Sequence, residues 1–451
     1  MVSVPALNVE AAWDAHKKDF SALIQIPSVY DKATAAPGMP YGKPVRQALD
    51  FMKALCEKEG FQIQDYEGAA FSASWGKGER IDIVSHLDVV QVDGDWEEDP
   101  FSGLIHDGYV HGRGSQDMKS GAFLSFLALK MVKDSGILPQ REIRLVYGSD
   151  EERTMDDMRL YVKHAGLPAF AFTPDGRFPM VVGEKGALMW TMKGAYHGFV
   201  RSLTGGIQPN VIAPSAEADI AFSDLEAVRS AAQRLGISAK VSECPQGLHL
   251  TVGGKAAHAS RPEDGRNATV DLLHLLSQLQ PDAQLRQLHQ FFRDPYGAGA
   301  HMAYEIPPMG KLSLNLGILR IQQGTLTAHI DCRYPHGVTS QVLTDTIRNA
   351  FPAYSVELPY DDPPTLVAET DPYIAVLKAA YEETTGQPCG AEISGGVSYS
   401  KVFGHSVTFG TVGAHSVGLA HQKNEKISEA DCIAALEIYV RTIQKLVEVA
   451  Q

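Results

Sequence analysis

The chain has 451 residues, 44% of them hydrophobic and 21% charged, which is enough for two or three globular domains with large cores. Its formal net charge of −14 argues against a nucleic-acid surface, because phosphate binding needs clustered Lys and Arg side chains. No apolar run approaches the roughly 20 residues that cross a bilayer, so no membrane partner is expected.

The first part of the chain alternates between helical and strand-like patterns. In chain order, the predicted elements are helices over 9–26, 44–60 and 122–132 and strands over 61–66, 69–75, 80–85, 141–148 and 169–172. Strands that alternate with helices predict an α/β fold with a mainly parallel sheet. Such sheets bind ligands beyond the carboxyl ends of their strands.

The pattern changes near residue 187 and changes back near residue 365. Between these points we predict strands over 188–194, 247–253, 311–315 and 325–331 and helices over 270–279 and 340–351. Afterwards a helix over 372–385, a strand over 407–410 and a helix over 428–449 resume the earlier pattern. We therefore predict a discontinuous domain of residues 1–186 and 366–451, with an α+β domain of residues 187–365 inserted into it.

Side chains that can bind a metal follow one apolar run after another: His86, Asp88, Asp117, Glu151, Glu152, Asp175 and His421. His86 and Asp88 lie two residues apart at a strand end and point to the same side, so a carboxylate can fix the tautomer of a metal-binding imidazole. Two imidazoles with several carboxylates suit two Zn²⁺-like ions if one carboxylate bridges them. A remaining carboxylate can then act as a general base.

The glycine-rich loop Gly114–Gly121 precedes a helix and contains Asp117. Backbone N–H groups and the helix dipole favour an anionic group at such a position. We therefore expect a negative charge to be held in this loop.

Five sequence blocks together resemble those of peptidase family M20, and within that family the chain is most similar to the PepV-type dipeptidases. The blocks are SHLDVV, DPFSGLIHDGYVHGRGSQDMKSG, YGSDEE, FTPDGRFP and HQKNE. The blocks occur in the family's order across nearly the whole chain. The resemblance implies a zinc-exopeptidase-like α/β/α catalytic domain with an inserted α+β lid domain. Met118 departs from the family pattern at a position that is not a ligand position, so the metal site is little affected. Val397 and Ser398 also depart from it, which affects substrate preference more than the reaction.

The resemblance also implies roles for the residues that follow the strands. Asp117 would bridge two divalent ions, with His86 and Asp175 completing one site and Glu152 and His421 the other. Glu151 would be the general base, and Asp88 would orient His86. The peptide bond between Asp117 and Met118 is expected to be cis.

The resemblance also implies five residues that bind substrate, three of them in the inserted domain and two in a later glycine turn. His258 would donate a hydrogen bond to the oxyanion of the tetrahedral intermediate. Arg333 could pair with a substrate carboxylate, and Asn210 resembles a further lid contact. Gly395 and Gly396 match a glycine turn that lets the substrate approach the backbone.

These residues predict a hydrolase that uses two divalent ions, Zn²⁺ or alternatively Mn²⁺ or Co²⁺, to cleave dipeptides or very short peptides with a free C-terminal carboxylate. An amidase or deacylase of N-acyl amino acids, or a carboxypeptidase, is an alternative within the same chemistry. A metal-binding protein without catalytic activity is an alternative of another class, which the presence of Glu151 disfavours.

The partner is expected to be a small peptide. The long insertion favours a monomer, because its extra half could replace a partner subunit, and a dimer is the alternative. Five scattered cysteines and the lack of a signal peptide predict reduced thiols and a cytoplasmic location. We assign no site role to four further histidines, which are His106, His111, His301 and His415.

Overall fold

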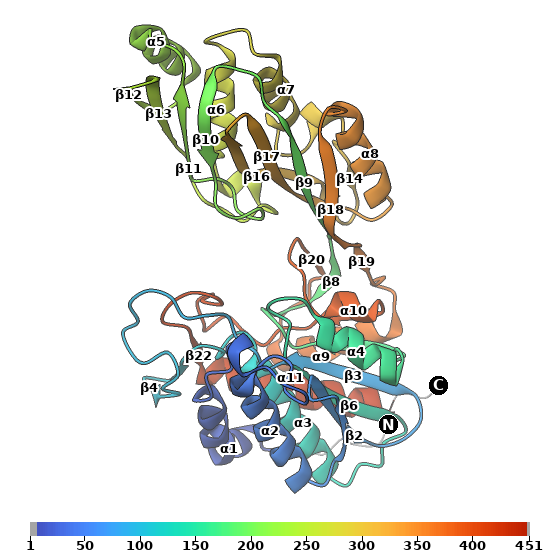
Figure 1. Cartoon of the computed structure of the whole chain (residues 1–451). Helices are drawn as coiled ribbons and strands as arrows, with labels where there is room; N and C mark the ends of the chain where they lie inside the picture. Colours follow the sequence, from blue (N-terminus) through green and yellow to red (C-terminus); the bar gives the residue numbers. More distant parts are fainter. Residues whose placement is uncertain (1–6, 449–451) are drawn as a thin grey trace. The chain divides into compact units, whose positions relative to one another are not determined.

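A computed structural model describes residues 7–448 of the chain, which divide into two compact units (Figure 1). The first unit comprises the residues up to Val182, Leu366–Glu392 and the residues from Ser398 onward. The second unit comprises Gly183–Thr365 and Ile393–Val397, so it is inserted into the first. The α/β fold with an inserted α+β domain is confirmed.

Nine strands form the large sheet. In spatial order its path is β1 (Gln62–Tyr66), β2 (Ala70–Trp75), β6 (Glu142–Gly148), β3 (Arg80–His86), β7 (Phe170–Thr173), β21 (Ser406–Thr408), β8 (Val181–Glu184) and β19 (Thr365–Leu366), and β20 (Glu392–Ser394) pairs with β8. The central strands β6, β3, β7 and β21 are parallel, whereas β1, β2 and β8 pair antiparallel. The predicted parallel sheet is therefore correct for the centre, and its flanks are antiparallel.

Helices cover both faces of the large sheet (Figure 1). They are α1 (Val9–Ile24), α2 (Lys43–Lys58), α3 (Lys119–Asp134), α4 (Asp156–Ala165), α9 (Pro372–Thr385), α10 (Ser400–Phe403) and α11 (Glu429–Glu448). Helix α3 is apolar on nearly every side and almost wholly buried, because it packs against β3, β6, α1 and α11. No helix of the described residues is long and apolar enough to cross a membrane.

Strand register sets the position of the polar residues in the first unit. His86 of β3 pairs with Gly148 of β6, and Ile83 pairs with Phe172 of β7. Continuing the second register brings His86 level with Asp175. The side chains that follow these three strands therefore meet at one edge of the sheet, as the sequence pattern predicted.

A small three-stranded sheet also belongs to the first unit. It consists of β22 (Lys426–Ser428), β5 (Tyr109–His111) and β4 (Ile105–His106), in that order. Strand β22 leads directly into α11. This small sheet therefore joins the loop before α3 to the C-terminal part of the chain.

The second unit contains an eight-stranded antiparallel sheet. Its order is β12 (Ala239–Cys244), β13 (Gly247–Gly253), β11 (Ser215–Ile220), β10 (Val200–Gly205), β16 (Ser313–Gln322), β17 (Thr325–Tyr334), β9 (Gly186–Ala195) and β18 (Ser355–Asp362). A hairpin of β14 (Glu305–Ile306) and β15 (Gly310–Lys311) lies apart from it.

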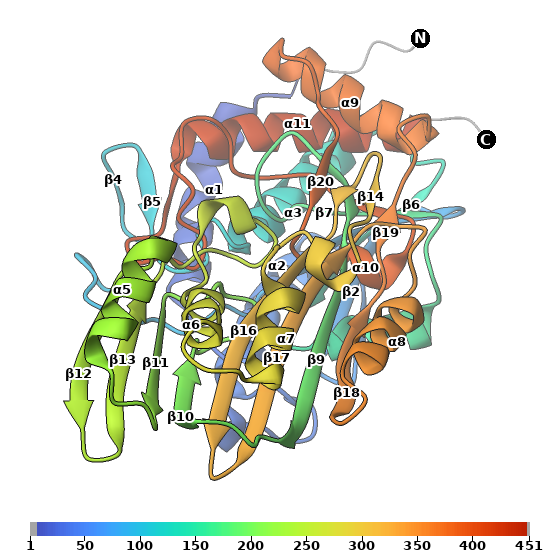
Figure 2. The same cartoon turned by 90° about the horizontal axis from the view of Figure 1, so that it is seen from above.

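Four helices lie on one face of the eight-stranded sheet (Figure 2): α5 (Leu225–Leu235), α6 (Ala268–Ser277), α7 (Ala283–Phe292) and α8 (Ser340–Ala350). Buried leucines of α6 and α7 pack with Leu203, Leu250 and Leu316 of the sheet in one apolar core. The one-sided helix layer follows from strands that alternate between apolar and polar side chains.

Candidate metal centre

The structure brings together the residues that the sequence predicted as metal ligands. His86 ends β3, Asp117 lies in the loop before α3, and Asp175 follows β7. Glu152 follows β6, and His421 lies in the loop before β22. Elements that are distant in sequence therefore supply one cluster, which we call the Asp117 centre.

Asp117 lies between the two imidazoles. Its Oδ1 is 3.1 Å from Nε2 of His86, and its Oδ2 is 3.0 Å from Nε2 of His421. Oε1 of Glu152 is 3.1 Å from His421 Nε2, and Oδ2 of Asp175 is 3.7 Å from His86 Nε2. The two oxygens of one carboxylate thus face two different ligand sets, which is the arrangement of a bridging ligand.

The Nε2 atom of His86 is a buried polar atom without a hydrogen-bond partner among the described residues, which also indicates a bound ion. Carboxylate oxygens surround it. A buried polar atom without a partner is costly unless something absent from the chain binds it. Imidazole and carboxylate are the ligands that Zn²⁺ takes alongside thiolate, so the residues fit such an ion.

The electrostatics of the Asp117 centre favour cations. Burial raises the pKa of Glu151 well above its usual range, and burial with the nearby charge of Asp117 raises the pKa of Asp175 to about 8. Hydrogen bonds that the His421 ring donates to the carboxylates of Asp117 and Glu152 raise the pKa of His421 to about 11. The buried carboxylates therefore repel one another and attract positive charge, which divalent ions supply.

Glu151 and Glu152 turn in different directions after β6. Glu152 contacts His421, whereas Oε2 of Glu151 lies 3.9 Å from Nε2 of His86. The Glu151 side chain is only 10% exposed. One of the two neighbours can therefore ligate while the other faces the reacting groups.

Asp88 acts on this cluster in two ways. Nδ1 of His86 lies 2.9 Å from the main-chain carbonyl oxygen of Asp88 and 3.5 Å from its Oδ1. The Asp88 carboxylate accepts hydrogen bonds from the N–H groups of Glu151 and Glu152. The carbonyl is thus the nearer partner of His86, and the carboxylate holds the turn that carries both glutamates.

Met118 contacts the main chain of His86. The N–H group of His86 donates to Sδ of Met118, which is fully buried. The peptide bond between Asp117 and Met118 is cis, which confirms the prediction. Met118 thus contacts the main chain of His86, a contact that the sequence did not suggest.

The negative charge expected in the loop Gly114–Gly121 comes from Glu425. Its Oε1 accepts hydrogen bonds from the N–H groups of Gly114, Gln116 and Asp117. Oε2 accepts a bond of 2.6 Å from Nη1 of Arg113, and both side chains are buried. Burial raises the pKa of Glu425 to about 7. Glu425 therefore fixes the main chain that presents Asp117.

Sequence reasoning missed the role of Glu425, although it is the last residue of the block HQKNE. It also missed Asp157 and Tyr399. Asp157 accepts hydrogen bonds from the main-chain N–H groups of Ser149 and Asp150 and from the Tyr399 hydroxyl. A Cβ atom at Gly148 would collide with both side chains, so glycine is required where β6 turns toward Glu151.

Replacing Glu425 by Gln is expected to destabilise the first unit by about 3 kcal/mol, because Arg113 would keep a buried charge without its partner. Thermal or urea unfolding of the metal-saturated protein measures the loss. Glu429→Gln is the matched control, since Glu429 is only partly buried in its contacts with Trp13 and Lys17 and should cost below about 1 kcal/mol. Equal losses in both variants would contradict the assignment.

In the second unit, the contacts of His258 define its tautomer. The N–H group of Ser260 donates to Nδ1 of His258, and Ser260 Oγ lies 2.7 Å from the same atom. A neutral ring therefore carries its proton on Nε2. Partial desolvation and the charge of Arg333 lower the pKa of His258, which favours the neutral form.

Arg333 lies on β17 and is buried against Asp331. Its Nε and Nη2 donate to the two carboxylate oxygens of Asp331 at 3.0 and 2.8 Å, and Nη1 donates to the carbonyl of Gly395. These contacts use three of the five N–H groups of a guanidinium. The side chain is therefore held in place while donors remain for an anion.

The other predicted lid residues lie near His258 in the fold of this unit. The main-chain carbonyl of Asn210 accepts a hydrogen bond from the N–H group of Ala259. A Cβ atom at Gly395 would come within 2.4 Å of the Ser260 Cβ, so only glycine fits there. Gly396 donates its N–H to Ser394 Oγ.

Relatives agree with this chain over nearly their full length. "Putative dipeptidase YtjP" of Bacillus subtilis (strain 168) is 30% identical over 451 residues, which cover 95% of this chain and 96% of that protein. A "Putative dipeptidase" of Staphylococcus epidermidis is 27% identical over 453 residues, with the same coverage of 95% and 96%.

Solved structures share the fold. Sso-CP2 of Sulfolobus solfataricus, described as an M20 family metallo-carboxypeptidase, has a TM-score of 0.60 at 15% identity and covers 96% of this chain and 99% of its own. Human carnosine dipeptidase 1 has a TM-score of 0.58 at 12% identity and covers 98% and 100%. The model of peptidase family M20/M25/M40 matches residues 83–445. As the five sequence blocks predicted, the chain belongs to peptidase family M20/M25/M40 and is a metal-dependent hydrolase.

Proposed function

We propose that this chain is a dipeptidase that hydrolyses dipeptides or very short peptides with a free C-terminal carboxylate. The observation that carries the proposal is the position of Asp117, whose two oxygens face His86 and His421 separately. The relatives named as dipeptidases support the substrate class.

Two divalent ions, Zn²⁺ in our proposal, would be held by His86, Asp117 and Asp175 on one side and by Asp117, Glu152 and His421 on the other. When bound, these ions supply Lewis acidity to the scissile carbonyl and to the attacking water. Mn²⁺ and Co²⁺ take the same ligand types and are the alternatives.

Protein side chains carry the proton transfers. Glu151 takes a proton from the attacking water and returns it to the leaving amine. Its nearly buried position supports this role, because burial raises the pKa of the carboxyl group above its usual range and so makes the carboxylate a stronger base. Asp88 keeps Glu151 in place through the hydrogen bond to its N–H group.

The second unit acts as the lid in this proposal. His258 donates from Nε2 to the oxyanion, since its Nδ1 is already an acceptor. Arg333 binds the substrate carboxylate with the donors that Asp331 and Gly395 leave over. Asn210, Gly395 and Gly396 complete the substrate site.

We also propose that the protein is a cytoplasmic monomer. The cysteines support the location, because all five are unpaired thiols, and four are buried. The large second unit, with an eight-stranded sheet, supports the monomer. Light scattering tests the monomer against a dimer.

Kinetics on a panel of dipeptides and their N-acetylated analogues test the proposed substrate. We expect kcat/KM to be at least about 100-fold higher for the free dipeptides, because a dipeptidase needs a free amine as well as a free carboxylate, and acetylation removes the amine. A chelator should abolish hydrolysis, and titration with Zn²⁺, Mn²⁺ or Co²⁺ should identify the ion that restores it. Faster cleavage of the acetylated compounds would instead assign a deacylase.

A further inference from the structure

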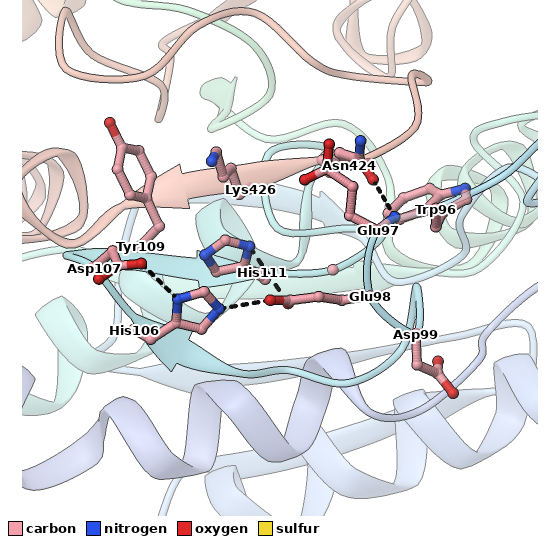
Figure 3. A pocket seen from close by; sticks show the side chains of 12 residues that line it. Trp96, Glu97, Glu98, Asp99, His106, Asp107, Tyr109, His111, Asn424 and Lys426 are labelled. Carbon is pink, nitrogen blue, oxygen red and sulfur yellow. Dashed lines mark hydrogen bonds and ion pairs between the residues drawn. The ribbon is translucent and has the colours of Figure 1, made fainter.

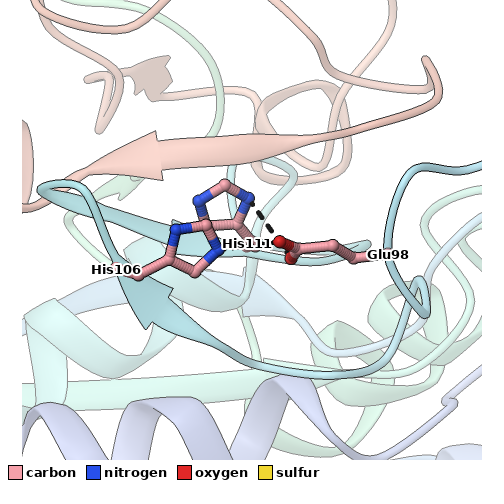
Figure 4. Close-up of side chains that lie close together, drawn as sticks. All are labelled: Glu98, His106 and His111. Atoms are coloured by element: carbon pink, nitrogen blue, oxygen red, sulfur yellow. Dashed lines mark hydrogen bonds and ion pairs between the residues drawn. The ribbon is translucent and has the colours of Figure 1, made fainter.

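A second group of metal-binding side chains lies in the first unit and shares no residue with the Asp117 centre. It consists of Glu98, His106 and His111, which we call the hairpin cluster (Figure 4). One ligand atom from each residue lies within 4.8 Å of the other two. His106 and His111 come from β4 and β5, and Glu98 comes from the loop before them.

The register of the hairpin places both histidines on one face. His106 pairs with Tyr109, and the N–H group of His111 donates to the carbonyl of Leu104. His106 and His111 are therefore diagonal neighbours across the two strands. Their rings are stacked with centroids 4.1 Å apart and an interplanar angle of 12°, so both ring edges can face the same carboxylate.

Glu98 lies against both ring edges. Its Oε1 is 2.8 Å from Nε2 of His106, and its Oε2 is 3.6 Å from Nδ1 of His111. A distance of 3.6 Å is too long for a hydrogen bond, but it is close to the roughly 3.4 Å that separates two ligand atoms of one tetrahedral Zn²⁺. Oε2 is also buried without a hydrogen-bond partner among the described residues.

Asp107 supplies the partner that a metal-binding histidine usually has. Its Oδ2 lies 3.1 Å from Nδ1 of His106. A carboxylate that accepts the Nδ1 proton fixes the tautomer in which Nε2 is available to an ion. Nε2 is the His106 atom that faces Glu98. One of the three ligands of the hairpin cluster, the His106 imidazole, is therefore already oriented by a carboxylate.

The hairpin cluster opens into a cavity of about 250 Å³ (Figure 3). Glu97, Asp99 and Asn424 line the same cavity, which leaves room for water as a further ligand. The cation Lys426 also lines it, but its Nζ lies over the ring of Tyr109, 4.8 Å from the centroid. The surrounding charge is therefore mainly negative.

We propose that Glu98, His106 and His111 bind one divalent ion of the Zn²⁺ class, separate from the ions of the Asp117 centre. Two imidazoles with one carboxylate form a ligand set that Zn²⁺ takes in proteins. The ion cross-links the loop of Glu98 to the hairpin. The same loop is bonded to Asn424, whose Oδ1 accepts the Glu97 N–H at 2.9 Å. The ion therefore steadies the loop that carries His421, three residues before Asn424.

The zinc content of the protein tests the proposal. The purified chain and its His106→Gln/His111→Gln variant are dialysed against Zn²⁺ buffered with a weak chelator, and bound zinc is measured by mass spectrometry. We expect the variant to hold one Zn²⁺ fewer per chain. The comparison counts a difference between two proteins, so it does not depend on activity or on the proposed substrate.

The chain offers a matched control in His274 and His289. Their rings are also stacked, with centroids 4.1 Å apart and an interplanar angle of 7°, but they belong to no three-residue cluster in the described chain. His274→Gln/His289→Gln should keep the wild-type zinc content.

Glu98→Gln keeps a hydrogen-bond acceptor for His106 and removes only the charged ligand. It is therefore the alternative test if the double variant at His106 and His111 does not fold. We expect the Zn²⁺ of the hairpin cluster to bind this variant more than about tenfold more weakly than it binds the wild type. Equal zinc content and affinity in the wild type and in both hairpin variants would overturn the proposal.

Discussion

Replacing Glu151 by Gln is expected to lower kcat for dipeptide hydrolysis by about 10³-fold, with KM changed less than about threefold. Glutamine has nearly the same size and can still accept a hydrogen bond, but it cannot take a proton from water. Because Glu151 is not among the five residues that we propose as metal ligands, and its Oε2 lies 3.9 Å from His86 Nε2, the substitution should leave the ligand set intact. Steady-state kinetics of the metal-saturated variant measure the loss.

Glu152→Gln is the matched control for this prediction. The two residues are neighbours after β6, but Oε1 of Glu152 contacts Nε2 of His421. We expect Glu152→Gln to lose bound metal, which mass spectrometry detects, whereas Glu151→Gln keeps the wild-type content. Hydrolysis by Glu151→Gln within tenfold of wild type would show that another group takes the proton.

The sequence was informative where function depends on strand ends. His86, Glu152 and Asp175 follow apolar runs, and parallel strands in register bring such positions to one edge without further information. The parallel centre of the sheet was predictable for the same reason. Its antiparallel flanks were not, because an isolated strand such as β2 has the same apolar pattern in either direction.

Residues that act through the main chain were harder to predict. Glu425 binds N–H groups more than 300 residues earlier, and nothing in its local sequence shows which loop it meets. The spacing of His86 and Asp88 predicted a carboxylate contact, yet the nearest acceptor for His86 is a carbonyl, which every residue possesses. Side-chain patterns carry no signal for such contacts.

The hairpin cluster escaped the sequence analysis because its strands are too short for a periodic pattern. Strand β4 has two residues and β5 has three, so neither shows the alternation that identifies a strand. Only the pairing of the two strands places His106 and His111 on one face. Two separated histidines therefore had no reason to be grouped before the structure was known.

Replacing His258 by Ala is expected to lower kcat by about 10²- to 10³-fold while KM changes little, because an oxyanion donor acts mainly in the transition state. This loss equals about 3–4 kcal/mol of transition-state stabilisation. The direction follows from the tautomer, since the Ser260 N–H occupies Nδ1 and leaves Nε2–H as the donor. Steady-state kinetics on a good dipeptide substrate measure both constants.

Two further variants separate this role from a structural one. His258→Gln retains an N–H donor at a similar distance from Cα and should recover part of the lost kcat. Ser260→Ala removes the hydroxyl contact of 2.7 Å but keeps the main-chain N–H, so it should cost less than about tenfold. If His258→Ala raised KM by the same factor and left kcat unchanged, His258 would bind the ground state, and the oxyanion assignment would be wrong. The Ser260 N–H group fixes the tautomer in which Nε2 carries the proton. Comparing kcat among the three variants therefore tests this geometry of the lid as well as the identity of the donor residue.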